Sequence, residues 1–199
     1  MPESDQLARA HAVIVLAAGG SSRLGQPKQL LVHCGETLVR RAARLALSTG
    51  PSDAVIVIGA HAKSIFAEVQ NLPLRRIDCA DWRSGMSASL RTGLGALAAD
   101  CAGALIMACD QLTLTSAHLD ALCAAWRTQP QRTVASHYAG RLGIPALLPR
   151  SWFKELQQQA AGDHGARSLL AAKRDEVSAI ANESLAFDID RPEDLALLT

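Results

Sequence analysis

Two cations are spaced through a glycine-rich segment that follows an apolar run near the start of the chain. Residues 16–31 read L-A-A-G-G-S-S-R-L-G-Q-P-K-Q-L-L. Gly19 and Gly20 let the backbone pass close to a ligand and direct N–H groups at phosphate oxygens. Arg23 can make forked contacts to phosphate, and Lys28 adds a point charge on a flexible stem. The pattern predicts a loop that binds the phosphate groups of a nucleotide.

The spelling of this loop excludes two common phosphate-binding motifs. A Walker A loop places Lys directly after its second glycine, whereas Gln26 and Pro27 follow Gly25 here. A dinucleotide-binding loop needs G-x-G-x-x-G, but Ser21 stands where its second glycine would be. The remaining alternative is an ordinary connection between a strand and a helix, with a surface Arg and Lys. Two glycines, two serines and two spaced cations favour a ligand-binding loop.

Three aspartates are candidates for holding a metal ion. Asp110 ends an apolar run, where a carboxylate contributes nothing to packing, although it could also form a turn or cap a helix. Asp188 and Asp190 alternate with apolar residues, so on a strand both carboxylates would share one face. Asp190 also precedes Pro192 and Glu193 in a pattern typical of a helix capping box. The sequence leaves both roles of Asp190 open.

Alternating strands and helices must position these side chains. Short apolar runs ending at Gly or Asp are typical of strands buried on both faces, and segments between them have helical periodicity. This order implies right-handed βαβ crossovers and an α/β, Rossmann-like three-layer fold, whose ligands bind beyond the carboxyl ends of the strands. The late strands interrupt the alternation, which predicts a mostly parallel but mixed central sheet. The expected strands are Ala12–Ala17, Ala54–Ile58, Arg75–Ile77, Gly103–Cys109, Thr133–Ser136, Ile144–Leu148 and one ending near residues 187–190; the expected helices are Thr37–Leu47 (with Thr37 as N-cap), His61–Val69, Gly85–Ala98, one capped by Thr115 or Ser116, Trp152–Gln159, Ala166–Ala172 and a last one from Pro192.

The string at residues 16–31 resembles the signature of the MobA-like nucleotidyltransferases. Within that family it is most similar to the branch of molybdenum cofactor cytidylyltransferase and its relatives. The resemblance covers about Ala12 to Leu198 and implies a fold of the nucleotide-diphospho-sugar transferase type. Further matching stretches are Gly85–Arg91, Cys109–Gln111, Gly162–Arg167 and Asp188–Leu195.

The resemblance also implies roles for individual residues. Nucleotidyl transfer needs no covalent enzyme intermediate, because positioning and charge neutralisation by Mg²⁺ and cations do the work. Mg²⁺ takes few protein ligands, and Asp110 would be the principal one with Asp190 as the second. Arg23, Lys28 and Asp110 would be catalytic. The nucleotide would contact Ala17, Ala18, Gly19, Gly20, Ser21, Ser87 and Ser89.

Individual positions bear on the substrates and on the surroundings of the metal. The guanylyl-transferring branch typically has glycine where Ala18 stands, which favours CTP. Relatives usually have proline two residues after Asp110, where Leu112 stands here, and this departure concerns the rigidity of the following loop. Residues 162–167 could hold the acceptor's phosphate with help from Arg167, or simply cap a helix and leave Arg167 at the surface. The arginines of the first predicted helix are expected to form a solvated face; they are Arg40, Arg41 and Arg44.

Composition and charge exclude several functional classes. The formal net charge is +1 without a block of like charges, so a nucleic-acid surface is not expected. No apolar run approaches the roughly 20 residues that cross a bilayer, and the polar first residues do not resemble a signal peptide. Five cysteines without a C-x-x-C pair indicate reduced thiols of a cytoplasmic protein. With 199 residues, 49% of them hydrophobic, we expect a single nucleotidyltransferase domain over residues 1–199, with residues 1–11 as a flexible tail.

Together these features predict Mg²⁺-dependent transfer of a nucleotidyl group, CMP from CTP, onto a phosphorylated small molecule, with release of diphosphate. The resemblance makes molybdopterin the favoured acceptor and a target molybdoenzyme a candidate partner. One alternative is the same chemistry on a sugar or alcohol phosphate. Another is a non-catalytic nucleotide- or cofactor-binding accessory protein in molybdoenzyme maturation. The presence of Arg23, Lys28 and Asp110 together favours catalysis.

Overall fold

The computed structural model describes residues 10–159 and 166–198. The expected glycine-containing anion loop before Arg167 lies outside the described residues, as does most of the expected N-terminal tail. That tail ends earlier than the sequence suggested. His11 already belongs to the first strand and is 2% exposed, and its Nε2 lies 2.9 Å from the Thr49 hydroxyl.

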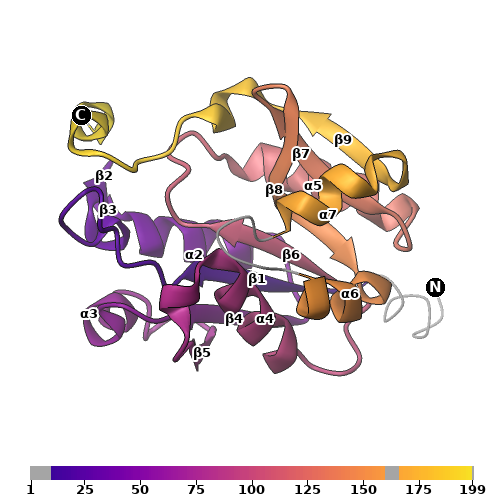
Figure 1. Ribbon diagram of the computed structural model, residues 1–199, viewed down its shortest axis with the longest axis horizontal. Coiled ribbons are helices and arrows are strands. Elements are labelled where there is room, and N and C mark those ends of the chain that lie inside the picture. Colours follow the sequence, from indigo (N-terminus) through magenta and orange to yellow (C-terminus); the bar gives the residue numbers. More distant parts are fainter. Residues whose placement is uncertain (1–9, 160–165, 199) are drawn as a thin grey trace.

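A seven-stranded mixed sheet forms the centre of the fold (Figure 1). Within it β8 runs against its neighbours, and the other six strands run in one direction. A separate two-stranded hairpin is formed by β2 (Val32–His33) and β3 (Glu36–Thr37). In spatial order the sheet consists of β5 (Arg75–Asp78), β4 (Asp53–Ile58), β1 (His11–Ala17), β6 (Gly103–Ala108), β8 (Arg141–Pro149), β7 (Thr133–Tyr138) and β9 (Val177–Ala181).

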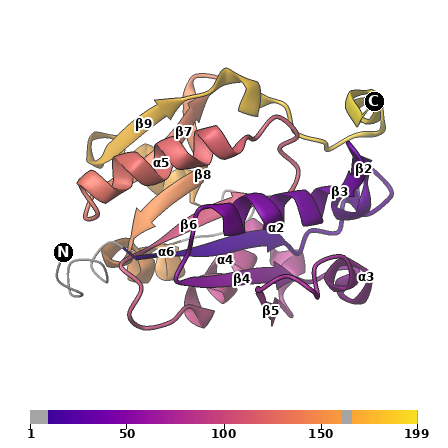
Figure 2. The ribbon, with the colours of Figure 1, turned by 180° about the vertical axis from the view of Figure 1, so that it is seen from behind.

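Helices cover both faces of the sheet and complete three layers. Alternate side chains of β1 point to opposite faces of the sheet: Val13 and Val15 pack with α2, whereas Ile14 and Leu16 pack with α4. Comparing Figures 1 and 2 shows the two helical layers in turn. This arrangement confirms the predicted Rossmann-like α/β fold. One layer holds α2 (Leu38–Ser48), α3 (Ala62–Ala67) and α5 (Ser116–Thr128), and the other holds α4 (Met86–Ala96), α6 (Phe153–Gln159) and α7 (Arg167–Ala172).

The predicted late strand is misplaced. The last strand of the sheet is β9, and residues 187–190, which follow a 3-10 turn after β9, form no strand. The expected last helix is a 3-10 helix, η7 (Pro192–Leu198). Further 3-10 turns are η1 (Lys28–Leu30), η2 (Trp82–Ser84), η3 (Arg150–Trp152), η5 (Arg174–Glu176) and η6 (Glu183–Ala186).

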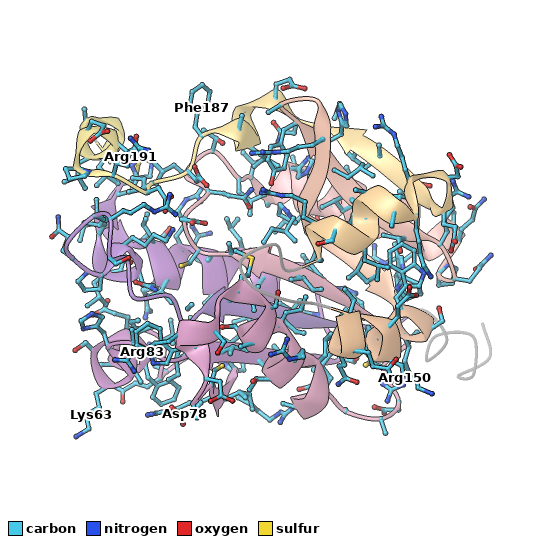
Figure 3. The ribbon with its side chains drawn as sticks, in the orientation of Figure 1. Lys63, Asp78, Arg83, Arg150, Phe187 and Arg191 are labelled. Atoms are coloured by element: carbon cyan, nitrogen blue, oxygen red, sulfur yellow. The ribbon has the colours of Figure 1, made fainter. Side chains whose placement is uncertain are left out.

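The C-terminal segment crosses back to the first third of the chain. In both ribbon views η7 lies beside the β2–β3 hairpin (Figures 1 and 2). Ile189 is fully buried in a small apolar cluster with Leu24, Leu38 and Leu112, while Phe187 points outward (Figure 3). The segment therefore brings late residues to the loop that follows β1. Across the described residues, no helix is long and apolar enough to cross a membrane.

Candidate active site

The carboxyl ends of three neighbouring parallel strands meet at one edge of the sheet. Strand β1 lies between β4 and β6, so the residues that follow these strands converge. The glycine-rich loop follows β1, Gly59 follows β4, and Asp110 comes two residues after β6. The glycine-rich loop and Asp110 therefore lie at the carboxyl ends of the parallel strands, as expected from the sequence.

Hydrogen bonds within the loop after β1 fix its shape. Ser21 has a left-handed backbone (φ 51°), and its carbonyl accepts hydrogen bonds from the N–H groups of Leu24 and Gly25, both at 3.1 Å. Its hydroxyl accepts a hydrogen bond from the N–H of Lys28 at 3.1 Å. Ser21, expected among the nucleotide-binding residues, thus also sets the course of the chain toward Lys28.

A buried glutamine that sequence reasoning missed secures the start of the loop. Gln29 is 1% exposed, and its Nε2 donates hydrogen bonds to the carbonyls of Ala17 at 3.1 Å and Gly19 at 2.7 Å. These bonds tie η1 to the end of β1. The signal for this role was present in the sequence, because Gln29 is a polar residue at the start of the apolar stretch that follows Lys28.

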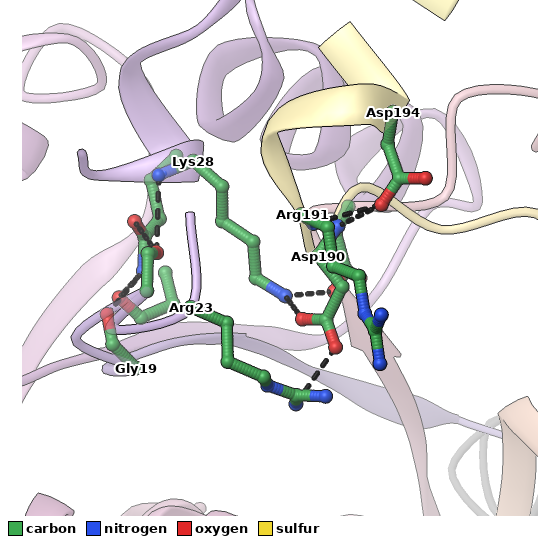
Figure 4. Close-up of polar contacts among 10 residues, drawn as sticks. Gly19, Arg23, Lys28, Asp190, Arg191 and Asp194 are labelled. Atoms are coloured by element: carbon green, nitrogen blue, oxygen red, sulfur yellow. Dashed lines mark hydrogen bonds and ion pairs between the residues drawn. The ribbon is translucent and has the colours of Figure 1, made fainter. Parts of the chain in front are cut away.

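Lys28 joins two of the predicted metal ligands. Its Nζ lies 2.6 Å from Asp110 Oδ2 and 3.2 Å from Asp190 Oδ1. The other oxygen of Asp190, Oδ2, lies 2.7 Å from a guanidinium nitrogen of Arg23, whose side chain is 68% exposed (Figure 4). The structure therefore brings together all four residues to which the family resemblance assigns catalysis or metal binding.

Charge and burial determine protonation at this cluster. Burial opposes the charged form of Lys28, but the Asp110 carboxylate, its hydrogen bond and Asp190 outweigh that effect and raise the pKa of Lys28. Lys28 is consequently a permanent cation. The pKa of Asp188 is also raised, first because protein atoms displace part of its water and then because Asp110 and Asp190 repel a further negative charge. The site thus holds three carboxylates, but among the side chains described only those of Lys28 and Arg23 supply positive charge beside them.

The side chain of Asp190 does not cap the last helix. The carboxylate of Asp194 accepts the N–H groups of Asp190 at 2.9 Å and Arg191 at 2.8 Å, a contact that the capping pattern assigns to Glu193 (Figure 4). The carboxylate of Asp190 itself pairs with Lys28 and Arg23. Its buried neighbour Ile189 anchors the backbone at this point.

The loop after Asp110 is held by contacts that replace the rigidity of a proline. Leu112 is 8% exposed and packs against Ile189 and Leu24. Arg41 donates hydrogen bonds to the carbonyls of Gln111 and Leu114. The expectation that Arg41 belongs to a solvated face is therefore wrong, because its guanidinium satisfies two loop carbonyls that would otherwise need water.

The other expected arginines of α2 and its expected N-cap also have specific partners. Arg40 donates hydrogen bonds to the carbonyl of Glu68, and Arg44 pairs with Glu36. The hydroxyl of Thr37 makes no capping hydrogen bond to α2; it donates to the Glu68 carboxylate at 3.1 Å.

The residues expected to contact the base lie on the same edge. Ala18 is 2% exposed and belongs to the same buried cluster as Ala88, which places the start of α4 beside the end of β1. Ser87 and Ser89 flank Ala88 and are both buried. Within the described part of the chain the Ser87 hydroxyl has no hydrogen-bond partner. A buried hydroxyl without a partner is available to a ligand or a water.

Trp82, which sequence reasoning also missed, explains two of the glycines. A Cβ atom on Gly20 would lie 2.8 Å from the Trp82 ring, and one on Gly59 would lie 2.6 Å from Trp82 Cβ and Cγ. Gly20 is therefore required by protein packing, whereas a Cβ on Gly19 would meet nothing within 4 Å. Open space in front of Gly19 leaves its backbone accessible to a ligand.

The donor set fits a magnesium ion that keeps several of its waters. Oxygens of Asp110 and Asp190 approach one ammonium group, so both can approach one cation. Mg²⁺ is commonly held by one or two carboxylates together with substrate phosphates and water. No cage of three or more His, Cys, Asp or Glu side chains occurs in the described ranges, and a site of this kind does not need one.

Comparisons with known proteins show to which family the chain belongs. A family model described as the MobA-like NTP transferase domain matches residues 13–177. The chain is 29% identical over 194 residues to the purine catabolism protein PucB of Bacillus subtilis (strain 168), covering 91% of this chain and 92% of that protein.

Solved structures show the same fold. Rv0371c from Mycobacterium tuberculosis H37Rv superposes with a TM-score of 0.81 at 26% identity, covering 96% of this chain and 98% of that one. A nucleotidyl transferase from Methanothermobacter reaches a TM-score of 0.80 over 95% of this chain and 96% of its own, and at 19% identity it supports the fold alone. The family expected from the glycine-rich signature is confirmed, and the chain belongs to the MobA-like NTP transferase domains.

Proposed function

We propose that this nucleotidyltransferase moves CMP from CTP onto a phosphorylated small molecule, with Mg²⁺ as cofactor and molybdopterin as the favoured acceptor. The observation that carries the proposal is the ammonium of Lys28 between Asp110 and Asp190, at the loop where the triphosphate would bind. The reaction would take place in the cytoplasm. A target molybdoenzyme would then receive the product.

The reaction needs charge neutralisation more than acid–base chemistry. A phosphate oxygen of the acceptor attacks the α-phosphorus, a new P–O bond forms, the α–β bridging bond breaks, and diphosphate leaves with its electron pair. Magnesium bound by Asp110 and Asp190 would polarise phosphate oxygens and offset charge on the leaving group. Lys28 and Arg23 would add positive charge at the same place. Because the pKa of Lys28 is raised, Lys28 acts as a cation and not as a proton acceptor.

The choice of CTP rests on Ala18. Its methyl group is buried at the end of β1, where the guanylyl-transferring branch typically has glycine. A side chain at this point narrows the space beside the loop backbone, which favours the smaller pyrimidine ring. Ser87 supports base binding, since its buried hydroxyl lacks a partner among the described residues.

Diphosphate release tests the proposal. The protein is incubated with each nucleoside triphosphate, with Mg²⁺ or Mn²⁺, and with molybdopterin, a sugar phosphate or an alcohol phosphate. We expect release with CTP and molybdopterin only when the metal is present. Triphosphate binding without release in any combination would refute catalysis and favour the accessory function.

Asp110→Ala tests the metal site. We expect at least about a 100-fold loss of turnover. The unfolding midpoint should also fall, because the buried ammonium of Lys28 loses its nearest carboxylate, so turnover is measured at a temperature at which the variant is folded. Asp120→Ala, an exposed position on α5, is the matched control and should retain full turnover. Full activity in Asp110→Ala would show that the metal is held elsewhere.

A further inference from the structure

A pocket opens beside Asp110 on the side of the β7–β8 hairpin. Its wall includes Asp110 and Asp188 from the carboxylate cluster, together with Gln111, Tyr138, Arg141 and Arg167. It is therefore continuous with the site described above. None of the last four residues takes part in the contacts that hold the triphosphate loop.

The amide of Gln111 presents an oxygen that has no partner. Gln111 is 6% exposed, and its Nε2 donates to the carbonyl of Ile144 at 3.0 Å. Only the nitrogen of an amide can donate to a carbonyl, so this bond fixes the orientation of the group. Among the described residues the Oε1 atom has no hydrogen-bond partner. A buried acceptor without a hydrogen bond is unfavourable, and a donor group on a ligand would supply that bond.

Tyr138 shares the carbonyl to which Gln111 donates. Its hydroxyl donates to the same Ile144 carbonyl at 3.0 Å, so both acceptor positions of that oxygen are used. The ring lies close to Gly143, where a Cβ atom would be 2.5 Å from the hydroxyl.

Two arginines supply positive charge to the same pocket. Arg141 and Arg167 are exposed, and neither forms an ion pair within the described part of the chain. Other surface arginines do have carboxylate partners, for example Arg75 with Asp53 and Arg76 with Asp78. Burial raises the pKa of Tyr138; Arg167 and Arg141 act to lower it, and Asp188 and Asp110 act to raise it, so charges of both signs act on this wall of the pocket.

We infer that this pocket selects the acceptor: its anionic group binds Arg141 and Arg167, and an N–H or O–H group of the same molecule donates to Gln111 Oε1. Naming the ligand as the acceptor rests on the proposed function. Both features are needed, because the arginines attract any anion whereas the fixed amide oxygen accepts only a donor. Asp110 and Asp188 repel an anion from their part of the wall, so the arginines determine where it binds.

Binding of four small probes tests the inference without requiring turnover. Isothermal titration compares pterin-6-carboxylate with neutral pterin, and glucose 1-phosphate with glucose. The first pair offers ring N–H donors and the second offers hydroxyl donors. We expect the anionic member of at least one pair to bind about tenfold or more tightly than its neutral counterpart, since a hydrogen bond to a charged group contributes that much. The pair that shows the preference identifies the donor type.

Three variants and one control show which residues cause the preference for the anionic probe. Arg141→Gln and Arg167→Gln should each reduce the ratio between anionic and neutral probes, while Arg174→Gln, an exposed arginine outside the pocket, should leave it unchanged. Gln111→Leu should weaken both members of the pair by about tenfold and preserve their ratio, because it removes the acceptor and not the charge. Unfolding midpoints check that each variant is folded.

Clear outcomes would overturn the inference. These are an absence of preference for either anionic probe, arginine variants that keep the wild-type ratio, or a folded Gln111→Leu that keeps wild-type affinity. If Gln111→Leu does not fold, the two arginine variants still decide whether the pocket selects anions. Failure of the proposed function is separate: probes that bind as expected in a protein that never releases diphosphate would refute catalysis and support a ligand pocket.

Discussion

Replacing Gln29 with leucine should weaken both the fold and triphosphate binding. The side chain is 1% exposed and donates to two carbonyls of the loop, at 3.1 and 2.7 Å. The bond to the exposed Gly19 contributes about 1 kcal/mol, and the buried Ala17 carbonyl left without this donor costs about 1–3 kcal/mol. Because leucine nearly fills the space, the cavity contribution is small. The sum is a loss of about 2–4 kcal/mol in the free energy of unfolding.

Gln29→Glu separates hydrogen bonding from shape. A carboxylate at this position would face two carbonyl oxygens, so its pKa should rise above the value of about 4.3 for an unfolded glutamate. A group with a raised folded-state pKa stabilises most below its unfolded pKa and loses that stability as pH rises. We therefore expect Gln29→Glu to be less destabilised at pH 4 than at pH 7, relative to wild type at the same pH.

Urea unfolding measures the free energy of unfolding of each variant, and titration with CTP measures its affinity for the triphosphate. Gln158→Leu and Gln158→Glu, at an exposed position of α6, are the matched controls and should stay within about 0.5 kcal/mol of wild type. Gln29→Leu should also bind CTP more weakly, because the loop backbone at Gly19 is no longer held. A Gln29→Leu protein with wild-type stability and affinity would refute the claim that this amide secures the loop.

Two further predictions concern the C-terminal segment and the first strand. Ile189→Ala should remove about 2–4 kcal/mol of packing energy from the cluster with Leu24 and Leu112. Turnover should fall, and hydrogen exchange should become faster in residues 187–198 while it stays slow in β1. Equally fast exchange in β1 would contradict a local role. Burial, with a smaller contribution from Arg127, lowers the pKa of His11 to about 4, so the unfolded chain takes up a proton below about pH 6.5 that the folded chain does not. Stability should consequently fall by about 2 kcal/mol between pH 6.5 and pH 5 in urea titrations, and His11→Gln should remove much of that slope. An unchanged slope in His11→Gln would assign the acid sensitivity to other groups.

The core strands could be predicted because each carries its own signal. The apolar runs that became β1, β4 and β6 are buried on both faces, and their order makes their carboxyl ends converge. Lys28 and Asp110 could therefore be assigned to one site from local patterns. The same local reasoning misplaced the last strand, because residues 187–190 form no strand although their polar and apolar side chains alternate.

The remaining site residues depend on contacts between distant segments. Each of the missed residues contacts a distant part of the chain. Gln29 donates hydrogen bonds to carbonyls of the loop after β1, Arg41 donates to carbonyls of the loop after Asp110, and Trp82 fills the space beside two glycines. No periodicity encodes such partners. Asp190 shows the limit most directly, since metal binding and helix capping were equally compatible with the sequence. Its carboxylate pairs with Lys28 and Arg23, two residues at least 162 positions away, and no local pattern encodes that contact.

The pairing of Lys28 with Asp190 has a consequence for synthesis of the protein. The two residues are 162 positions apart, so at about 5–20 residues per second Asp190 leaves the peptidyl transferase centre roughly 10–30 s after Lys28. During that interval the growing chain can form β1, β4 and β6 and place Lys28 beside Asp110. The second carboxylate is still missing, so a nascent or prematurely terminated chain would have the framework of a nucleotide site without its full charge complement. Activity would thus begin only after Asp190 has been synthesised and has folded back to Lys28.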